Sequence, residues 1–127
     1  MIPEYKVVLV IFVAWYTIFT FLDAALAHAQ SQHNVQINFG SSSPANFQFF
    51  TPAYLVVNRG AQITWVNNDV VTHSINLIDP NLRLNVDQPP SDVVDPNSSI
   101  TYTFREPGVY DYYCALYPFM TGRIVVN

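Results

Sequence analysis

Residues 107–126 read PGVYDYYCALYPFMTGRIVV and carry the clearest indication of the fold. Two runs within this stretch, residues 109–114 and 123–126, are rich in the β-branched and aromatic residues that strands favour. A Pro-Gly pair precedes the first run, and a loop containing a second proline joins the two. The stretch therefore predicts two strands joined by a loop, with Cys114 at the end of the first strand.

Short runs rich in β-branched and aromatic residues recur along the chain at intervals typical of a small all-β domain. Short segments such as Asn58-Arg59-Gly60 separate these runs, and they contain residues that favour turns. Residues 80–98 contain four prolines among polar residues and predict a long irregular connection. No repeat or second domain is visible. We predict a β-sandwich or Greek-key barrel, with the remaining strands at residues 35–39, 54–57, 62–66, 73–78 and 99–104.

Composition excludes several classes of protein. The chain has 127 residues, of which 50% are hydrophobic and 11% charged, so it is not disordered. The net charge of −4 provides no basic surface for nucleic acid. A single cysteine excludes an intramolecular disulfide and a zinc site built from several cysteines.

Much of the hydrophobic excess lies in residues 7–22, VVLVIFVAWYTIFTFL, which contain no charge. Such a run is typical of a signal peptide, and the later Ala27-His28-Ala29 resembles a cleavage site. If uncleaved, it is a transmembrane anchor that contacts the membrane. In both cases the preceding Lys6 predicts that the following domain is extracytoplasmic, periplasmic or on the outer face of the cell membrane. We expect a leader or anchor helix at residues 1–29 and one β-domain at residues 30–127.

Three side chains form a candidate site for a soft metal ion. Cys114 and Met120 lie six residues apart, and His73 lies on another predicted strand. Thiolate and thioether select copper, and imidazole binds either of its redox states. The alternative is structural, because a free cysteine is often a small core residue, a strand histidine often only hydrogen-bonds, and methionine fills core gaps.

Residues 60–74, GAQITWVNNDVVTHS, and residues 107–126 resemble the two ligand segments of the cupredoxins, the plastocyanin-like blue-copper family. Residues 50–57 resemble the strand that precedes the first segment. The resemblance implies a Greek-key β-sandwich and one mononuclear copper site. It places His73, Cys114 and Met120 at the positions of the first histidine, the cysteine and the axial methionine.

One position departs from the family pattern, because Tyr117 stands where the family has its second histidine. Three outcomes are open at this point. Copper binds through His73, Cys114 and Met120, with Tyr117 or water completing the set. Otherwise the fold holds no metal and Tyr117 hydrogen-bonds to His73, or a partner protein donates the missing ligand.

The resemblance favours an exported copper protein in electron transfer or copper handling, with an atypical site. Its expected partner is a redox protein or a membrane protein complex. The alternative is a metal-free accessory subunit of a membrane complex such as a copper-dependent oxidase. No nucleophile-base-acid set or carboxylate pair can be placed, so we do not expect an enzyme.

Overall fold

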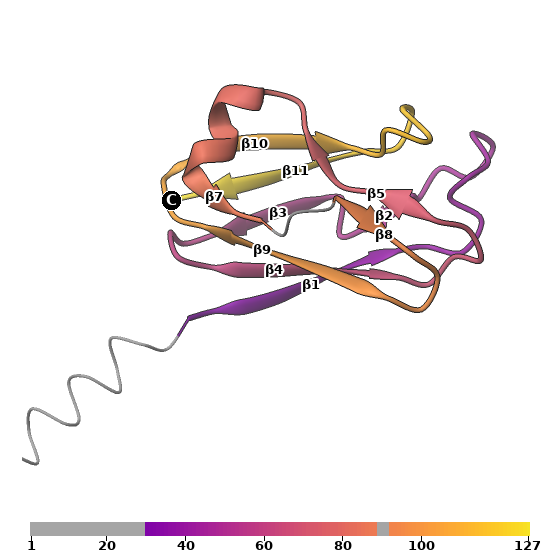
Figure 1. Cartoon of the computed structure of the whole chain (residues 1–127), viewed down its shortest axis with the longest axis horizontal. Helices are drawn as coiled ribbons and strands as arrows, with labels where there is room; N and C mark the ends of the chain where they lie inside the picture. Colours follow the sequence, from indigo (N-terminus) through magenta and orange to yellow (C-terminus); the bar gives the residue numbers. More distant parts are fainter. Residues whose placement is uncertain (1–29, 89–91) are drawn as a thin grey trace, which may run out of the picture.

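The computed structural model describes residues 30–88 and 92–127 (Figure 1). The hydrophobic segment at residues 7–22 and the predicted helix lie outside this part of the chain. Within the described part, no helix is long and apolar enough to cross a bilayer.

The domain is a sandwich of two main sheets, which confirms the all-β prediction (Figure 1). One sheet has the strand order β2-β1-β4-β9-β7, and the other has β3-β11-β10-β6. A third, two-stranded sheet pairs β5 with β8. The strands of the first sheet are β1 (Gln32–Ile37), β2 (Phe50–Thr51), β4 (Gln62–Asn67), β7 (Val86–Asp87) and β9 (Ser99–Phe104). The others are β3 (Tyr54–Val57), β5 (His73–Ser74), β6 (Asn76–Leu77), β8 (Val93–Val94), β10 (Gly108–Tyr113) and β11 (Thr121–Val126).

Two parallel pairings give the sandwich its mixed character. β1 pairs in parallel with β4, and β3 with β11, whereas the remaining pairs are antiparallel. Parallel neighbours cannot be joined by a tight hairpin. The chain therefore crosses from one sheet to the other between β2 and β3, and back again between β3 and β4.

The core between the sheets is aromatic. Alternation along β4 and β9 turns Trp65 and Tyr102 inward, with ring centroids 5.2 Å apart. Tyr112 of the opposite sheet lies 5.2 Å from Trp65, edge to face, so this contact joins the two sheets. All three side chains are fully buried. Edge-to-face rings of this kind add stabilisation beyond the area they bury.

Several predicted boundaries are corrected by the structure. The strand predicted at residues 35–39 is β1, which begins and ends earlier, at Gln32–Ile37. The predicted strand at residues 73–78 is divided at Ile75 into β5 and β6, because the first half pairs with β8 and the second with β10. The predicted irregular connection at residues 80–98 contains β7, β8 and the 3-10 helix η1 (Pro80–Asn85). Asp79 caps η1 by accepting a hydrogen bond from the backbone of Asn81.

Candidate metal centre

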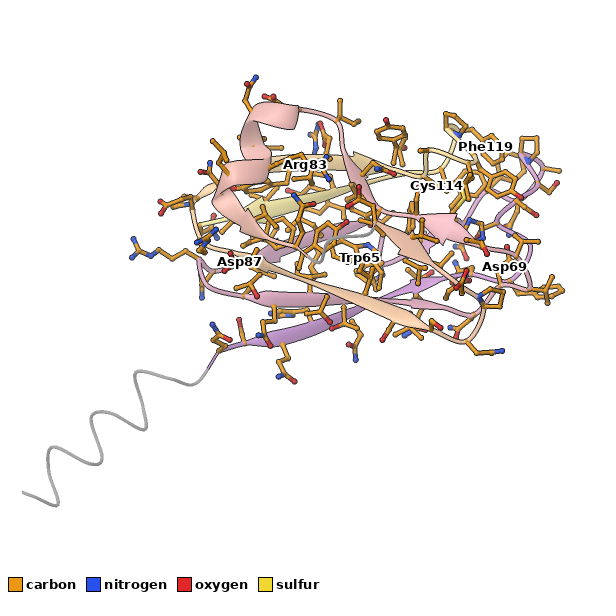
Figure 2. The ribbon with its side chains drawn as sticks, viewed as in Figure 1. Trp65, Asp69, Arg83, Asp87, Cys114 and Phe119 are labelled. Carbon is orange, nitrogen blue, oxygen red and sulfur yellow. The ribbon has the colours of Figure 1, made fainter. Side chains whose placement is uncertain are left out.

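Three loops meet at the end of the sandwich where Asp69, Cys114 and Phe119 are labelled in Figure 2. Cys114 follows β10 directly, and His73 opens β5. The side chains of His73, Cys114 and Met120 are completely buried. The three side chains predicted to bind metal are thus all withdrawn from solvent.

The His73 Nδ1 atom lies 3.7 Å from the Cys114 sulfur. Two donors that share one metal ion at about 2.0 Å for nitrogen and about 2.3 Å for sulfur are separated by roughly 3.5–3.8 Å at tetrahedral to trigonal angles. The observed separation falls in this range. The donor pair therefore fits a metal ion without rearrangement of the strands that carry it.

Asp69 determines which nitrogen of His73 faces the cysteine. Its Oδ2 atom lies 2.8 Å from His73 Nε2, and its Oδ1 atom accepts hydrogen bonds from the backbone of Gly40 and Val70. Burial would raise the pKa of this carboxyl, but the hydrogen bonds from Gly40, His73 and Val70 outweigh burial and lower the pKa below 3.8. The ionised carboxylate can only accept, so Nε2 carries a proton, and in the neutral imidazole the lone pair is on Nδ1, the nitrogen that faces the cysteine.

The cysteine sulfur is oriented by the strand that contains His73. The backbone N–H of Ser74 donates to the sulfur at 3.3 Å. The Ser74 hydroxyl accepts the N–H of Ala115 at 2.8 Å and so joins β5 to the loop after Cys114. These bonds connect the His73 and Cys114 segments directly.

The loop from Cys114 to Met120 is closed by its own backbone. Cys114 N donates to Met120 O at 3.1 Å, Tyr117 N to Cys114 O at 3.2 Å, and Met120 N to Tyr117 O at 2.9 Å. The compact turn brings Met120 back into the core beside the strand end. This closure explains how a thioether six residues from the cysteine reaches the same buried region.

Tyr117 contacts His73 ring to ring. The two centroids are 5.3 Å apart, and the Tyr117 side chain is half-buried. The two nitrogens of His73 contact Asp69 and Cys114, so the hydrogen bond between Tyr117 and His73 expected for a metal-free site is not formed. Tyr117 instead covers the outer side of the imidazole.

The surface beyond Tyr117 is aromatic. Phe119 lies 6.2 Å from Tyr117 and 5.2 Å from Phe49 between ring centroids, and it is 40% exposed. Leu116 of the same loop is also exposed. The site is thus separated from solvent by rings rather than by charged groups.

Sequence reasoning did not assign roles to Asp69 and Ser74. The position of Asp69, four residues before His73, is a signal that could have identified it. Among the described residues, no three His, Cys, Asp or Glu side chains gather as a metal site, so the donor set requires a residue such as Met120. The remaining described histidine, His33, lies in β1 opposite Ile63 and not in this cluster.

A β-sandwich with a buried histidine-cysteine pair and a methionine on the cysteine loop defines the class of small single-copper electron carriers. A family model described as copper binding proteins of the plastocyanin/azurin family matches residues 35–127. The chain belongs to this family, which confirms the resemblance. Members hold one mononuclear copper and carry electrons rather than act as enzymes, as expected from the sequence.

Curated relatives support the same assignment. Amicyanin-alpha of Methylorubrum extorquens is 31% identical over 84 residues, which are 65% of this chain and 67% of that protein. Amicyanin of Paracoccus denitrificans is 32% identical over 83 residues, 65% of this chain and 61% of that protein. The chain thus matches about two thirds or less of each relative's length.

Solved structures agree on the fold. A novel purple cupredoxin from Nitrosopumilus maritimus superposes with a TM-score of 0.64 and 30% identity, covering 75% of this chain and 99% of that one. Amicyanin from Paracoccus versutus superposes with a TM-score of 0.57 and 21% identity, covering 79% and 83%. The second likeness concerns the fold alone.

Proposed function

We propose that the protein is an extracytoplasmic electron carrier whose copper site has one histidine. His73, Cys114 and Met120 are the ligands, and Tyr117 occupies the position of the second histidine. The observation that carries this proposal is the 3.7 Å separation of His73 Nδ1 and the Cys114 sulfur in a buried setting. Bound copper supplies a one-electron couple between Cu(I) and Cu(II).

The ligand types favour the reduced ion. Thiolate and thioether are soft donors that select Cu(I), and the absence of a second imidazole removes a ligand that also suits Cu(II). Cu(I) accepts three ligands, so the set of His73, Cys114 and Met120 is sufficient for it. Water, the Tyr117 phenol or a ligand from a partner completes the set in the oxidised form.

The surroundings of the site support electron transfer rather than catalysis. Asp69 and Ser74 hold the imidazole and the sulfur in place, and burial excludes bulk water. A fixed set of ligands reduces the rearrangement that a change of oxidation state requires. The buried donor pair and the family membership favour this function over the metal-free accessory subunit.

The partner is a redox protein that docks over Tyr117, Pro118 and Phe119. These residues form an apolar surface next to His73, and apolar patches with aromatic residues are typical of protein interfaces. Export by residues 7–22 brings the domain to an extracytoplasmic partner, and retention of that segment would keep it at the membrane.

Copper titration of the full-length chain, purified in detergent so that residues 7–22 are retained, tests the proposal. We expect one equivalent of copper per chain, tight Cu(I) binding in competition with a chelator, and a sulfur-to-copper absorption band with Cu(II). Cys114→Ser and His73→Ala should each abolish this band. His33→Ala is the matched control and should leave binding unchanged. Lack of uptake, or uptake that Cys114→Ser does not alter, would refute the proposal.

A further inference from the structure

A polar cluster contacts Ile75 and Asn76, the two residues that follow His73 and Ser74 in the chain. We call it the Asp92 cluster, and it consists of Asp92, Arg83, Tyr102 and Asn76. Asp92 Oδ2 accepts hydrogen bonds from Arg83 at 2.9 Å and from Asn76 at 3.1 Å. Asp92 Oδ1 accepts the Tyr102 hydroxyl at 3.1 Å. One carboxylate therefore joins η1, β6 and β9.

The cluster also binds the backbone of Ile75, the residue at which the predicted long strand divides. Ile75 N donates to the backbone oxygen of Asp92 at 2.9 Å. The one proton of the Tyr102 hydroxyl is shared between Ile75 O, which is the nearer acceptor, and Asp92 Oδ1. Both polar groups of the Ile75 backbone are thus held by the Asp92 cluster. Ile75 itself is completely buried, so neither group has water as an alternative.

Ile75 follows directly after two residues of the metal centre. His73 supplies the imidazole, and Ser74 supplies the N–H that contacts the Cys114 sulfur at 3.3 Å. The Ser74 hydroxyl donates to Asn76 Oδ1 at 2.7 Å, and this bond connects the cysteine side of the site to the Asp92 cluster. The short β5 strand has only two residues and pairs only with the equally short β8.

A two-residue strand has few ladder bonds of its own, so its position depends on what holds its ends. Hydrogen bonds to an ionised group are stronger than those between neutral groups. A buried network in which every polar group has a hydrogen-bond partner holds its side chains rigidly. Burial, followed by the charge of Asp92, raises the pKa of Tyr102, so the hydroxyl keeps its proton and remains a donor.

We propose that the Asp92 cluster positions the metal ligands: by holding Ile75 and Asn76 it sets the His73 imidazole and the Ser74 N–H against the Cys114 sulfur. Asp92, Arg83 and Tyr102 are positioning residues and do not themselves contact the metal. The inference rests on the proposed copper function only where it predicts a shift of the sulfur-to-copper band or of the reduction potential. The positioning of Ser74 and Ile75 can be tested in metal-free protein.

Two variants with matched controls test the proposal in the full-length chain. Asp92→Ala removes the carboxylate, and Asp87→Ala removes a carboxylate of an exposed ion pair with Arg105. Asp87 lies toward the opposite end of the sandwich from Cys114 in Figure 2. Tyr102→Phe removes one buried hydroxyl and keeps the ring, so it tests the proposal even if Asp92→Ala fails to fold. Tyr110→Phe is its control, because the Tyr110 hydroxyl bonds to Glu106 away from the site.

The first measurement uses metal-free protein. We expect amide hydrogen exchange at Ser74 and Ile75 to become about tenfold faster or more in Asp92→Ala and Tyr102→Phe, with smaller changes in β11. Alkylation of Cys114 should accelerate in the same variants. The controls should match the wild type at all of these positions.

The second measurement uses copper-loaded protein. The sulfur-to-copper band and the reduction potential should shift in Asp92→Ala and Tyr102→Phe but not in the controls. Unchanged exchange at Ser74 and Ile75 together with an unchanged band would overturn the positioning role. If the wild type takes up no copper, the proposed function fails, while the exchange and alkylation measurements still decide the role of the cluster.

Discussion

Asp69 Oδ2 lies 2.8 Å from His73 Nε2, and both side chains are almost completely withdrawn from solvent. This contact assigns the ring proton to Nε2 and directs Nδ1 to Cys114. In the proposed one-histidine copper site, no second imidazole helps to fix the position of the metal. The orientation of His73 by Asp69 therefore matters directly to the proposed site.

Asp69→Asn should weaken copper binding by about 10- to 100-fold, because a neutral amide no longer requires the Nε2–H tautomer. The change also removes a charged hydrogen bond and should lower the free energy of unfolding by about 1–3 kcal/mol. Competition with a Cu(I) chelator and chemical denaturation measure the two effects. Asp95→Asn is the control, because this substitution removes the same charge. Asp95 is exposed and accepts a hydrogen bond from the Thr72 hydroxyl, not from His73. Equal losses in both variants would contradict the role of Asp69.

Tyr117→His should restore the usual ligand set and produce a blue copper site. A second imidazole suits Cu(II), so the variant should bind Cu(II) more tightly than the wild type and show an intense visible band with a narrow EPR hyperfine splitting. Tyr117→Phe keeps the ring against His73 but removes the phenol. A Cu(II) spectrum unchanged in Tyr117→Phe would exclude phenolate ligation. Failure of Tyr117→His to alter the spectrum would show that the pocket cannot admit a second histidine.

Gly122→Ala should destabilise the fold by about 1–3 kcal/mol, the usual cost of overpacking. Gly122 faces Tyr112 across β10 and β11, and an added Cβ would overlap the Tyr112 ring. Tyr112 is completely buried and packs against Trp65, so its ring has no free space to enter. Thermal and urea denaturation measure the effect. Gly108→Ala is the control, since its Cβ would make only an ordinary 3.4 Å contact with Tyr110, and a loss as large as that of Gly122→Ala would contradict the argument.

Stability should decrease at acid pH partly through Asp111. The hydrogen bond from Arg123 lowers the pKa of Asp111 below its ordinary 3.8. The folded pKa lies below the unfolded one, so the contribution is present above about pH 4 and is lost as the pH falls through the folded pKa. We expect wild type to be slightly more stable than Asp111→Asn at pH 7, and the difference to decrease as the pH falls below about 4. The pair is half-exposed, so the difference should be small, and it should decrease in high salt. A difference that does not decrease as the pH falls below about 4 would contradict this assignment.

The strands and the ligand candidates could be predicted from the sequence because both follow from local patterns. Alternation in residues 62–66 and 99–104 reflects the two faces of a half-buried strand, and the predicted strands correspond to β4 and β9. The rarity of cysteine and the spacing of Cys114 and Met120 identified the candidate donors. The family assignment follows from the order of two such segments along the chain.

Only the tertiary structure decided how these donors are held. The break at Ile75 depends on two different partner strands, β8 and β10, which no local pattern in residues 73–78 encodes. The roles of Asp69 and Asp92 could not be predicted, because the sequence does not show from which distant groups a carboxylate accepts hydrogen bonds. The packing of Tyr117 on His73, rather than a hydrogen bond between them, follows from Asp69 and Cys114 already contacting both nitrogens of His73. Residue types and spacing therefore determined which chemistry the chain can offer, whereas long-range hydrogen bonds and burial determined the tautomer, orientation and exposure of each group.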